Sequence, residues 1–518
     1  MRRVLVFSLG LLGACSGATP VEDAGQEGDG GWHSRLYPED WTPSFTDDAG
    51  RFLHDFSYAG YAHGERAPMP TSSFIVHVAM DGGDMTGDVQ GALNAVAALD
   101  GGVVLLGPGR FRIDGTLTVT HSGVVLKGSG RDKTWLVFTK SFGLDYAGHL
   151  RFGGAQQLVG NWPLLEDGVT RSVSVKVGAS DAGALSVGDE VAVGHVITDE
   201  YVAEHGMTGF WSAFNGTWQP FAWRRVTAVA GDGTVTLDVP LRAVERTRDA
   251  ASLRRVTGQL REVGLEDLSL TNAVEPGAAY AATQVAAVSF SGVADGWVRR
   301  VSSFSEVDGG AQLQSVGLRL HQVNRVTVDD VHLAKAQHRG GGGNGYLFEV
   351  RQSSEVLFKD STATEGRHNF IQNWGFGTSG CVWLRVVSEG GFATAQPGGT
   401  QGGVGYSEFH HSLATANLLD SSRFDDGFSI INRRLESTGA GHTGTENVFW
   451  NVSGAGLLRS MQWGWGYVIG TDGLEVALDE VFIAEGTQPL DWAEGLDAGA
   501  TLQPRSLYED QLRRRLGR

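Results

Sequence analysis

Short apolar runs alternate with turn-forming residues along most of the chain. From residue 36 onward the strand-like runs are separated by glycine, asparagine and aspartate, which favour tight turns. Two stretches, residues 88–99 and residues 506–516, instead show the apolar spacing of one helix face. The pattern predicts an all-β chain with two helices.

The apolar runs also recur along the chain at intervals that suggest a solenoid. A β-solenoid coil takes roughly 20 residues or slightly more, and longer coils carry loops that tend to gather over one face. We expect Phe409 and Ile431 to point inward, which places His410 and Asn432 outward on one face. The points that we take as equivalent are separated by 22 to 39 residues and are Phe290, Leu318, Phe348, Phe370, Phe409, Ile431 and Val468.

The segment after the first predicted helix carries the most specific pattern. It reads GGVVLLGPGRF at 101–111, GTLTV at 115–119 and SGVVLKGSGRDKTWLVF at 122–138. With the acidic residues and helix before it, this segment resembles the opening of the pectate-lyase-like superfamily. The resemblance implies a right-handed single-stranded parallel β-helix with an N-terminal capping helix, but no particular chemistry, because this fold carries lyases, hydrolases, epimerases and phage adhesins. The matching residues are Asp84, Asp88, Gly101, Gly102, Pro108, Gly109, Leu126, Gly128 and Gly130.

Changes in pattern divide the chain into six parts. Residues 155–255 interrupt the solenoid pattern and predict a small inserted β subdomain, in which the aromatic residues favour a hydrophobic core over a sugar-stacking wall. The full division is 1–15 signal peptide and lipobox, 16–35 flexible tether, 36–154 N-terminal cap and first coils, 155–255 inserted subdomain, 256–490 coils with the expected groove, and 491–518 C-terminal cap.

Composition and charge narrow the function classes. The 518 residues include 75 glycines, and the formal net charge of −18 argues against a general nucleic-acid binder. One of the two cysteines, Cys381, lies in a strand-like run and is expected to be a buried apolar side chain.

The N-terminus predicts export. Two arginines, an apolar stretch and Leu12-Gly13-Ala14-Cys15 resemble a bacterial lipoprotein signal, in which Cys15 becomes the lipidated N-terminus. The alternative is an ordinary cleaved signal peptide. The lipoprotein interpretation places the protein at the bacterial cell surface or outer membrane, attached to the membrane through this lipid only.

Polar residues gather on three consecutive predicted coils. Because equivalent positions of neighbouring coils stack about 4.8 Å apart, residues distant in sequence become neighbours. The expected catalytic residues are His410, Arg433, His368 and His442, and the expected substrate-binding residues are Arg367, Asn369, Tyr406, Glu408, His411, Asn432, Trp211 and Trp218.

This inventory favours a polysaccharide lyase that acts on a uronate glycan. β-Elimination needs a group that neutralises the carboxylate, a base for the C5 proton and an acid for the leaving oxygen. We assign these roles to Arg433, His410 and His368 in that order, with His442 in reserve. The alternatives are a glycoside hydrolase that uses paired carboxylates among Glu365, Glu408, Asp425 and Asp426, a glycan-binding lipoprotein without catalysis, and a purely structural polar ladder.

The sequence predicts no metal ligands. His410 and His411 are adjacent and would point to opposite faces of a strand, and no zinc-type spacing is present. Calcium bound by scattered aspartates stays an alternative. The sequence does not define the oligomeric state. The expected partner is an anionic polysaccharide.

The lipobox generates the first testable prediction. Replacing the lipid-accepting thiol in Cys15→Ser should move the protein from the membrane fraction to the soluble fraction, because one sulfur atom carries the anchor. Fractionation of cells expressing both forms measures this, and membrane retention of the variant would contradict the lipoprotein interpretation.

Overall fold

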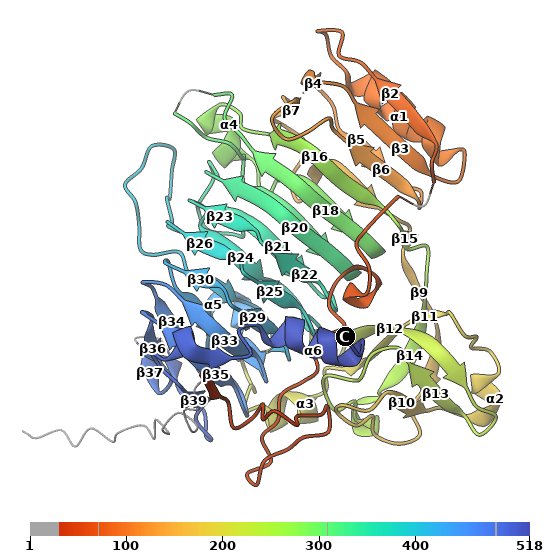
Figure 1. Ribbon diagram of the computed structural model, residues 1–518, viewed down its shortest axis with the longest axis vertical. Coiled ribbons are helices and arrows are strands. Elements are labelled where there is room, and N and C mark those ends of the chain that lie inside the picture. The colour runs from red at the N-terminus through yellow and green to blue at the C-terminus, as the bar shows by residue number, and fades with distance from the viewer. Residues whose placement is uncertain (1–30, 71, 308, 482–483) are drawn as a thin grey trace, which may run out of the picture.

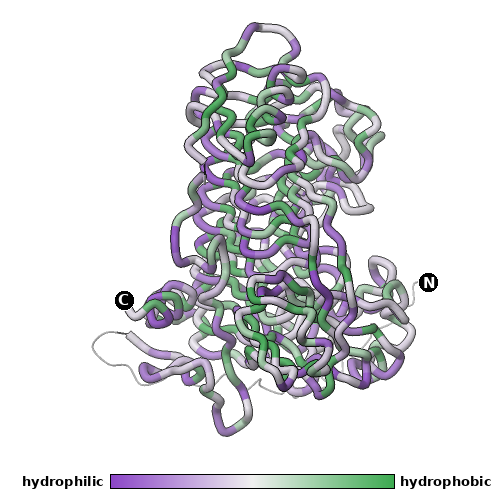
Figure 2. The backbone as a smooth tube through the Cα atoms, turned by 90° about the vertical axis from the view of Figure 1, so that its right-hand side faces the viewer, coloured by the Kyte–Doolittle hydropathy of each residue, from purple (hydrophilic) through white to green (hydrophobic). Residues whose placement is uncertain are grey.

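Most strands of this chain pair in parallel with a strand one coil further along. The computed structural model describes residues 31–518 except 71, 308 and 482–483, so the predicted signal peptide, Cys15 and most of the predicted tether lie outside the described residues. The coils stack along the long axis of the molecule (Figures 1 and 2). The fold is a right-handed parallel β-helix, as the sequence predicted.

One wall of the β-helix is a ten-stranded parallel sheet that carries the candidate site. In chain order its strands are β5 (Leu117–Val119), β8 (Gly148–Gly153), β17 (Ala286–Ser291), β19 (Val316–His321), β21 (Tyr346–Arg351), β24 (His368–Gln372), β27 (Ser407–Phe409), β31 (Phe428–Ile430), β34 (Leu457–Ser460) and β36 (Glu475–Ala477).

The remaining walls belong to an eighteen-stranded sheet. Its strands are β2 (Ile75–Val78), β3 (Gly102–Leu106), β4 (Gly109–Ile113), β6 (Val124–Lys127), β7 (Thr134–Phe138), β15 (Leu260–Arg261), β16 (Gly264–Thr271), β18 (Val293–Ser303), β20 (Asn324–Ala334), β22 (Leu357–Lys359), β23 (Thr362–Thr364), β25 (Val382–Leu384), β26 (Val387–Glu389), β29 (Leu418–Asp420), β30 (Arg423–Phe424), β33 (Val448–Ser453), β35 (Tyr467–Asp472) and β39 (Trp492–Glu494).

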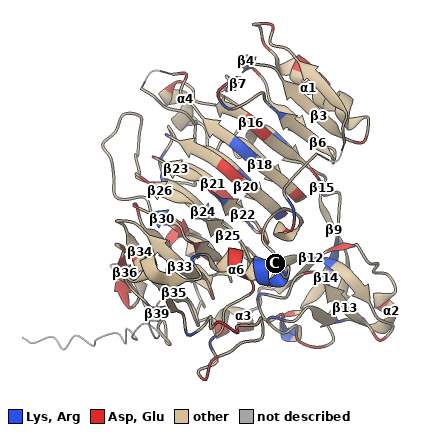
Figure 3. Ribbon diagram, in the orientation of Figure 1, with Lys and Arg blue, Asp and Glu red and all other residues tan. Residues whose placement is uncertain are grey.

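Charges of alternating sign run across the outer surface of this second sheet (Figure 3). Glu266 pairs in register with Arg299, Arg299 with Asp329, and Asp329 with Lys359. Opposite charges on directly neighbouring strands attract, so this column supports the parallel stacking.

Helices close and brace the solenoid. Helix α1 (Thr86–Ala97) buries Val89, Leu93 and Val96 against the first coils, as expected of the predicted capping helix. The C-terminal helix α6 (Leu507–Arg515) lies across the outer surface of the last coils (Figure 1). The short helices are α2 (Ala179–Ala182), α3 (Asp199–Glu204), α4 (Pro276–Ala281) and α5 (Glu436–Gly439).

The first described residues are fixed at the C-terminal end of the solenoid. Strand β1 (Trp32–His33) pairs in parallel with β40 (Leu502–Gln503), and Trp32 is buried. The chain then passes between α6 and the coils, where Phe56 N donates to Gln511 Oε1 at 2.8 Å, and continues toward α1. The end of the predicted tether is therefore part of the folded body.

The inserted subdomain forms a six-stranded antiparallel sheet of its own. Buried ion pairs join it to the solenoid: Arg325 contacts Glu190 at 2.7 Å, and Arg242 contacts Glu355 at 3.1 Å. Its strands are β9 (Gln157–Pro163), β10 (Ser174–Lys176), β11 (Glu190–Val196), β12 (Trp218–Val229), β13 (Thr234–Leu237) and β14 (Ser252–Thr257), and two further small pairs elsewhere are β28 (Ala414–Thr415) with β32 (Gly444–Thr445) and β37 (Glu480–Val481) with β38 (Ala484–Glu485).

The predicted alignment of coils is correct at some positions and wrong at others. Leu318 pairs with Phe348, and Phe348 with Phe370, as expected. Ser407 pairs with Phe428 and Glu408 with Ser429, so Ile430, not Ile431, continues the inner column of Phe409. Ile431 packs instead with Met461 and Ala484 in a separate cluster. In addition, Phe290 pairs with Leu320, and Val468 belongs to the other sheet, where it pairs with Phe449.

Cys381 is fully buried in the main core, as predicted for a small apolar side chain.

Within the described ranges, no helix is long and apolar enough to cross a membrane.

A buried carboxyl group at the base of α6 generates a prediction about pH. Asp420 Oδ2 accepts hydrogen bonds from Ser506 Oγ at 2.7 Å and from Tyr508 N at 2.8 Å, and burial raises the Asp420 pKa from 3.8 to about 7. A raised pKa means that the neutral form stabilises the fold, so this contribution is complete below the unfolded pKa and is lost as the pH rises toward 7.

We therefore expect Asp420→Asn, which cannot ionise, to gain stability relative to wild type as the pH rises from 4 to 8. The relative gain should reach at least about 1 kcal/mol across this range. Urea unfolding at several pH values measures it. A difference in unfolding free energy that does not change with pH would contradict the prediction.

Candidate functional site

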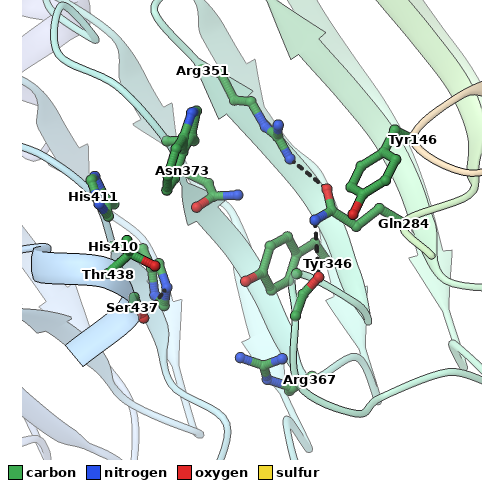
Figure 4. A pocket seen from close by; sticks show the side chains of 13 residues that line it. Tyr146, Gln284, Tyr346, Arg351, Arg367, Asn373, His410, His411, Ser437 and Thr438 are labelled. Carbon is green, nitrogen blue, oxygen red and sulfur yellow. Dashed lines mark hydrogen bonds between the residues drawn. The ribbon is translucent and has the colours of Figure 1, made fainter. Parts of the chain in front are cut away.

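A cavity of about 560 Å³ opens on the outer face of the ten-stranded sheet, beside β21 and β24 (Figure 4). Loops that follow β27 and β31 form its second wall. It is lined by Tyr146, Gln284, Gly342, Gly343, Tyr346, Arg351, Arg367, Asn373, Trp374, His410, His411, Ser437 and Thr438.

The register of the coils explains why these residues meet. Tyr346 pairs with His368, and one column of outward positions runs through Glu349, Ile371 and Glu408. Because side chains of parallel neighbours stack, groups more than 20 residues apart along the chain share one patch of surface. Asn373 and His410 follow directly at the ends of β24 and β27.

Glu408 is the centre of the site. Its carboxylate is buried and accepts from Arg433 Nη1 at 2.8 Å through Oε2 and from His410 Nδ1 at 2.5 Å through Oε1. His368 Nε2 lies 3.4 Å from the same Oε1 atom. Burial opposes ionisation, but Arg433 and the two histidines hold the Glu408 pKa well below its ordinary value. Glu408 is therefore an anion.

Both histidines beside Glu408 are neutral at pH 7. Burial lowers the pKa of His410 and lowers that of His368 to about 3. His368 Nδ1 donates to the Tyr406 carbonyl at 2.6 Å, whereas His410 Nε2 faces the cavity and lies 3.0 Å from Ser437 Oγ. His410 is thus the residue of this pair with a ring nitrogen at the cavity surface.

The opposite wall of the cavity is basic. The buried carboxylate of Glu349 accepts from Arg319 Nε at 2.6 Å and also pairs with Arg351. Burial alone would raise the Glu349 pKa, but the two arginines outweigh this effect and lower the pKa to about 2. Arg367 Nη1 donates to the Gly340 carbonyl at 2.6 Å. In the described part of the chain, no carboxylate lies within ion-pair distance of Arg367. Its charge is available to an anion in the cavity.

Three of the residues predicted from sequence line the cavity: His410, His411 and Arg367. His368 and Glu408 lie behind that surface, and Arg433 neutralises Glu408. Asn369 points into the solenoid, where Nδ2 donates to Asp426 Oδ2 at 2.8 Å. Asp426 is itself buried, which raises its pKa to about 6.

The other predicted residues lie elsewhere. The Tyr406 ring packs under the Arg459 guanidinium, whose central carbon lies 3.8 Å from the ring centre. Asn432 forms an isolated antiparallel β-bridge with His442. Burial lowers the His442 pKa to about 4. Trp218 Nε1 donates to Ser252 Oγ at 3.0 Å inside the inserted subdomain. Trp211 is buried between the subdomain and the solenoid, where Nε1 donates to the Ala440 carbonyl at 2.8 Å.

Sequence reasoning missed Tyr346, Arg351, Asn373, Trp374 and Ser437. Tyr346 and Arg351 lie on the coil directly before the predicted cluster, so extending the stacking by one coil would have found them. Ser437 gives no such signal, because its position depends on the course of the loop after β31.

Three donors of the site are close enough to surround a cation. Ligand atoms of His368, Glu408 and His410 lie within 4.8 Å of one another, and the sequence placed these residues together but not as metal ligands. However, a proton already joins His410 to Glu408, and the Arg433 guanidinium lies 2.8 Å from the carboxylate. A fixed positive charge at that distance opposes a second cation, so we assign no metal here.

No protein-family model matches the sequence, and no curated protein matches it. Several solved structures are similar at low identity. The tailspike protein gp49 from Pseudomonas phage LKA1 shares 14% identity over 79% of this chain and 70% of that chain, with a TM-score of 0.37. The A-module of Azotobacter vinelandii mannuronan C-5 epimerase AlgE6 shares 12% over 82% and 96%, with a TM-score of 0.35.

The Gp54 tailspike of Acinetobacter baumannii bacteriophage AP22, solved with a capsular saccharide, shares 9% over 88% of this chain and 80% of that chain, with a TM-score of 0.29. At these identities and TM-scores, the chemistry of this chain has to be argued from its own site.

The buried charge of Glu408 generates a stability prediction. Arg433→Ala leaves that anion without its cationic partner, which should lower the unfolding free energy by about 3 kcal/mol or more. Arg423→Ala is the control, because it breaks an exposed pair with Asp425 and should cost about 1 kcal/mol or less. Urea unfolding compares them, and equal losses would contradict the central role of Glu408.

Proposed function

We propose that the protein is an enzyme that cleaves an anionic, uronate-containing polysaccharide by β-elimination. The observation that carries this proposal is the pairing of a neutral histidine on one wall of the cavity with uncompensated positive charge on the other. The whole chain has a net charge of −18, yet the described lining of this cavity includes Arg351 and Arg367 and no carboxylate. Arg351 is paired with Glu349 behind the surface, so Arg367 supplies the charge that has no carboxylate partner among the described residues.

Each requirement of elimination has a matching group in the cavity. Arg367 can neutralise the substrate carboxylate, which makes the neighbouring C–H bond more acidic. His410 is a neutral base that ionised Glu408 orients through Nδ1. The Tyr346 hydroxyl points across the cavity toward His410 and Ser437 (Figure 4), and burial raises its pKa to about 12, so it keeps a proton for the leaving oxygen.

Hydrolysis by paired carboxylates fits the cavity less well. That chemistry needs one carboxyl group that carries a proton and a second that reaches the sugar. Glu408 and Glu349 are both buried, ionised and hydrogen-bonded to arginine. Neither can serve as the acid near neutral pH, which supports elimination over hydrolysis.

Elimination requires one local movement. His410 Nε2 accepts the Ser437 hydroxyl at 3.0 Å, and a substrate C–H group reaches this nitrogen only after that hydroxyl turns away. Ser437 belongs to a short surface turn, so this movement does not involve the coils.

We also propose that the lipid on Cys15 anchors the enzyme to the bacterial cell surface. Because Trp32 is fixed beside Leu502, such an anchor would hold the C-terminal end of the solenoid toward the membrane. The cavity lies on the side wall, and strands β34 and β36 of its sheet lie between it and that end.

The test is a panel of uronate, galactan and glucan polysaccharides. We expect a product with the ultraviolet absorbance of an unsaturated uronate from the uronate polymers only, and new reducing ends without that absorbance would contradict elimination. His410→Ala should reduce turnover by at least about a hundredfold. His332→Ala is the control, because that histidine pairs with Asp330 on β20, outside the cavity.

The pH profile is a further readout of the same experiment. A depressed histidine pKa means that the base becomes protonated only as the pH falls below the ordinary histidine range, so turnover should be lost on the acid side. Tyr346 keeps its proton up to a pH of about 12, so no alkaline loss is expected from the acid. A rate that rises on acidification would contradict this assignment.

A further inference from the structure

Ser437, His410 and Glu408 form a continuous hydrogen-bonded row. Ser437 Oγ lies 3.0 Å from His410 Nε2, and His410 Nδ1 lies 2.5 Å from Glu408 Oε1. The serine lines the cavity, the histidine lies at its surface and the carboxylate is buried behind them. This is the arrangement of nucleophile, base and orienting acid that serine hydrolases use on unrelated folds.

The positions of the hydrogens follow from the partners. Glu408 is ionised and can only accept, so the single ring hydrogen of neutral His410 lies on Nδ1. Nε2 then carries a lone pair, and the Ser437 hydroxyl must donate to it. Arg433 Nη2 donates to the same serine oxygen at 3.2 Å, which stabilises negative charge developing there.

The backbone at Ser437 is held in a conformation that non-glycine residues seldom adopt. Ser437 and Thr438 have φ values of 53° and 68°, in the left-handed region, inside the short turn α5. Turn residues throughout this solenoid, Ser421 among them, occupy the same region, so Ser437 is distinguished by its hydrogen bonds to His410 and Arg433.

The inserted subdomain holds this turn in place. A side chain at Gly439, which follows Thr438, would collide with the carbonyl oxygen of Phe210, so subdomain and turn are in direct contact there. Trp211 Nε1 donates to the Ala440 carbonyl at 2.8 Å, directly after the same turn. Ser437 is therefore fixed from behind and presented to the cavity.

We propose that Ser437 is the nucleophile of a second activity, the hydrolysis of carboxylic esters carried by sugars that bind in this cavity. His410 is the base and Glu408 a positioning residue. The Tyr346 hydroxyl points toward Ser437 across the cavity (Figure 4), and we assign it as the donor to the developing oxyanion.

The reaction balances with water as the only co-reactant. Ser437 Oγ attacks the ester carbonyl carbon while its proton passes to His410 Nε2. The bond from that carbon to the sugar oxygen breaks, and the sugar oxygen takes the proton from His410. Water then attacks the acyl-serine, transfers a proton to His410 and releases the carboxylic acid, and that proton returns to Ser437.

An active-site probe tests the nucleophile directly, without any polysaccharide cleavage. A fluorophosphonate reacts preferentially with an activated serine, and we expect it to label the full-length protein on the peptide that contains Ser437. Ser437→Ala should abolish the label and His410→Ala should reduce labelling at least about a hundredfold.

Ser421→Ala is the matched control. Ser421 is also a serine in the left-handed region, with φ 52°, but it donates to Arg505 O at 2.7 Å and has no histidine partner. This variant should label like wild type.

Ester turnover provides the second measurement. Wild type should hydrolyse p-nitrophenyl acetate and release acetate from an O-acetylated uronate polymer, and Ser437→Ala should lose at least about a thousandfold of both rates. Folding of each variant is checked by its thermal midpoint, since loss of one hydroxyl in a surface turn should leave it unchanged. An unlabelled Ser437 in folded wild type, or a Ser437→Ala variant that keeps its ester turnover, would overturn the proposal.

Discussion

A single buried anion, the carboxylate of Glu408, determines the arrangement of the candidate site. An isolated charge in the wall of a β-helix is strongly unfavourable, so it persists only where cations and hydrogen-bond donors surround it. Arg433 and His410 provide that environment at 2.8 and 2.5 Å. Each of them also contacts Ser437, so the groups that neutralise the anion also orient the hydroxyl at the cavity surface.

The solenoid was predictable because every coil has to bury its inward apolar residues in the same way. An inward apolar residue must meet another on the next coil, and Phe348 over Phe370 follows that rule closely enough to be read from sequence. The alignment failed by one residue at Ile431, because β27 and β31 have only three residues each and offer little alternation to fix the register. Loops of unequal length around them removed the remaining signal.

The site was predictable only in part, for a related reason. Stacking brings His368, Glu408 and His410 together, and these were identified from the coils that carry them. Trp211 was named among the substrate-binding residues, although the aromatic segment favoured a hydrophobic core, and it packs in such a core behind the α5 turn. This contact between the subdomain and the turn joins residues more than 200 positions apart. No local pattern encodes such a contact. The same contact gives the insertion a structural reason: it supports the turn that carries Ser437.

The lone pair on His410 Nε2 can accept only one proton at a time, which limits the chemistry of this cavity. His410 Nδ1 is committed to Glu408, so Nε2 alone can take a proton, from a sugar carbon or from Ser437. Elimination therefore needs the serine displaced, whereas ester hydrolysis needs it in place. If the cavity carries out both proposed reactions, they can follow one another but cannot occur together, because they need opposite positions of the Ser437 hydroxyl.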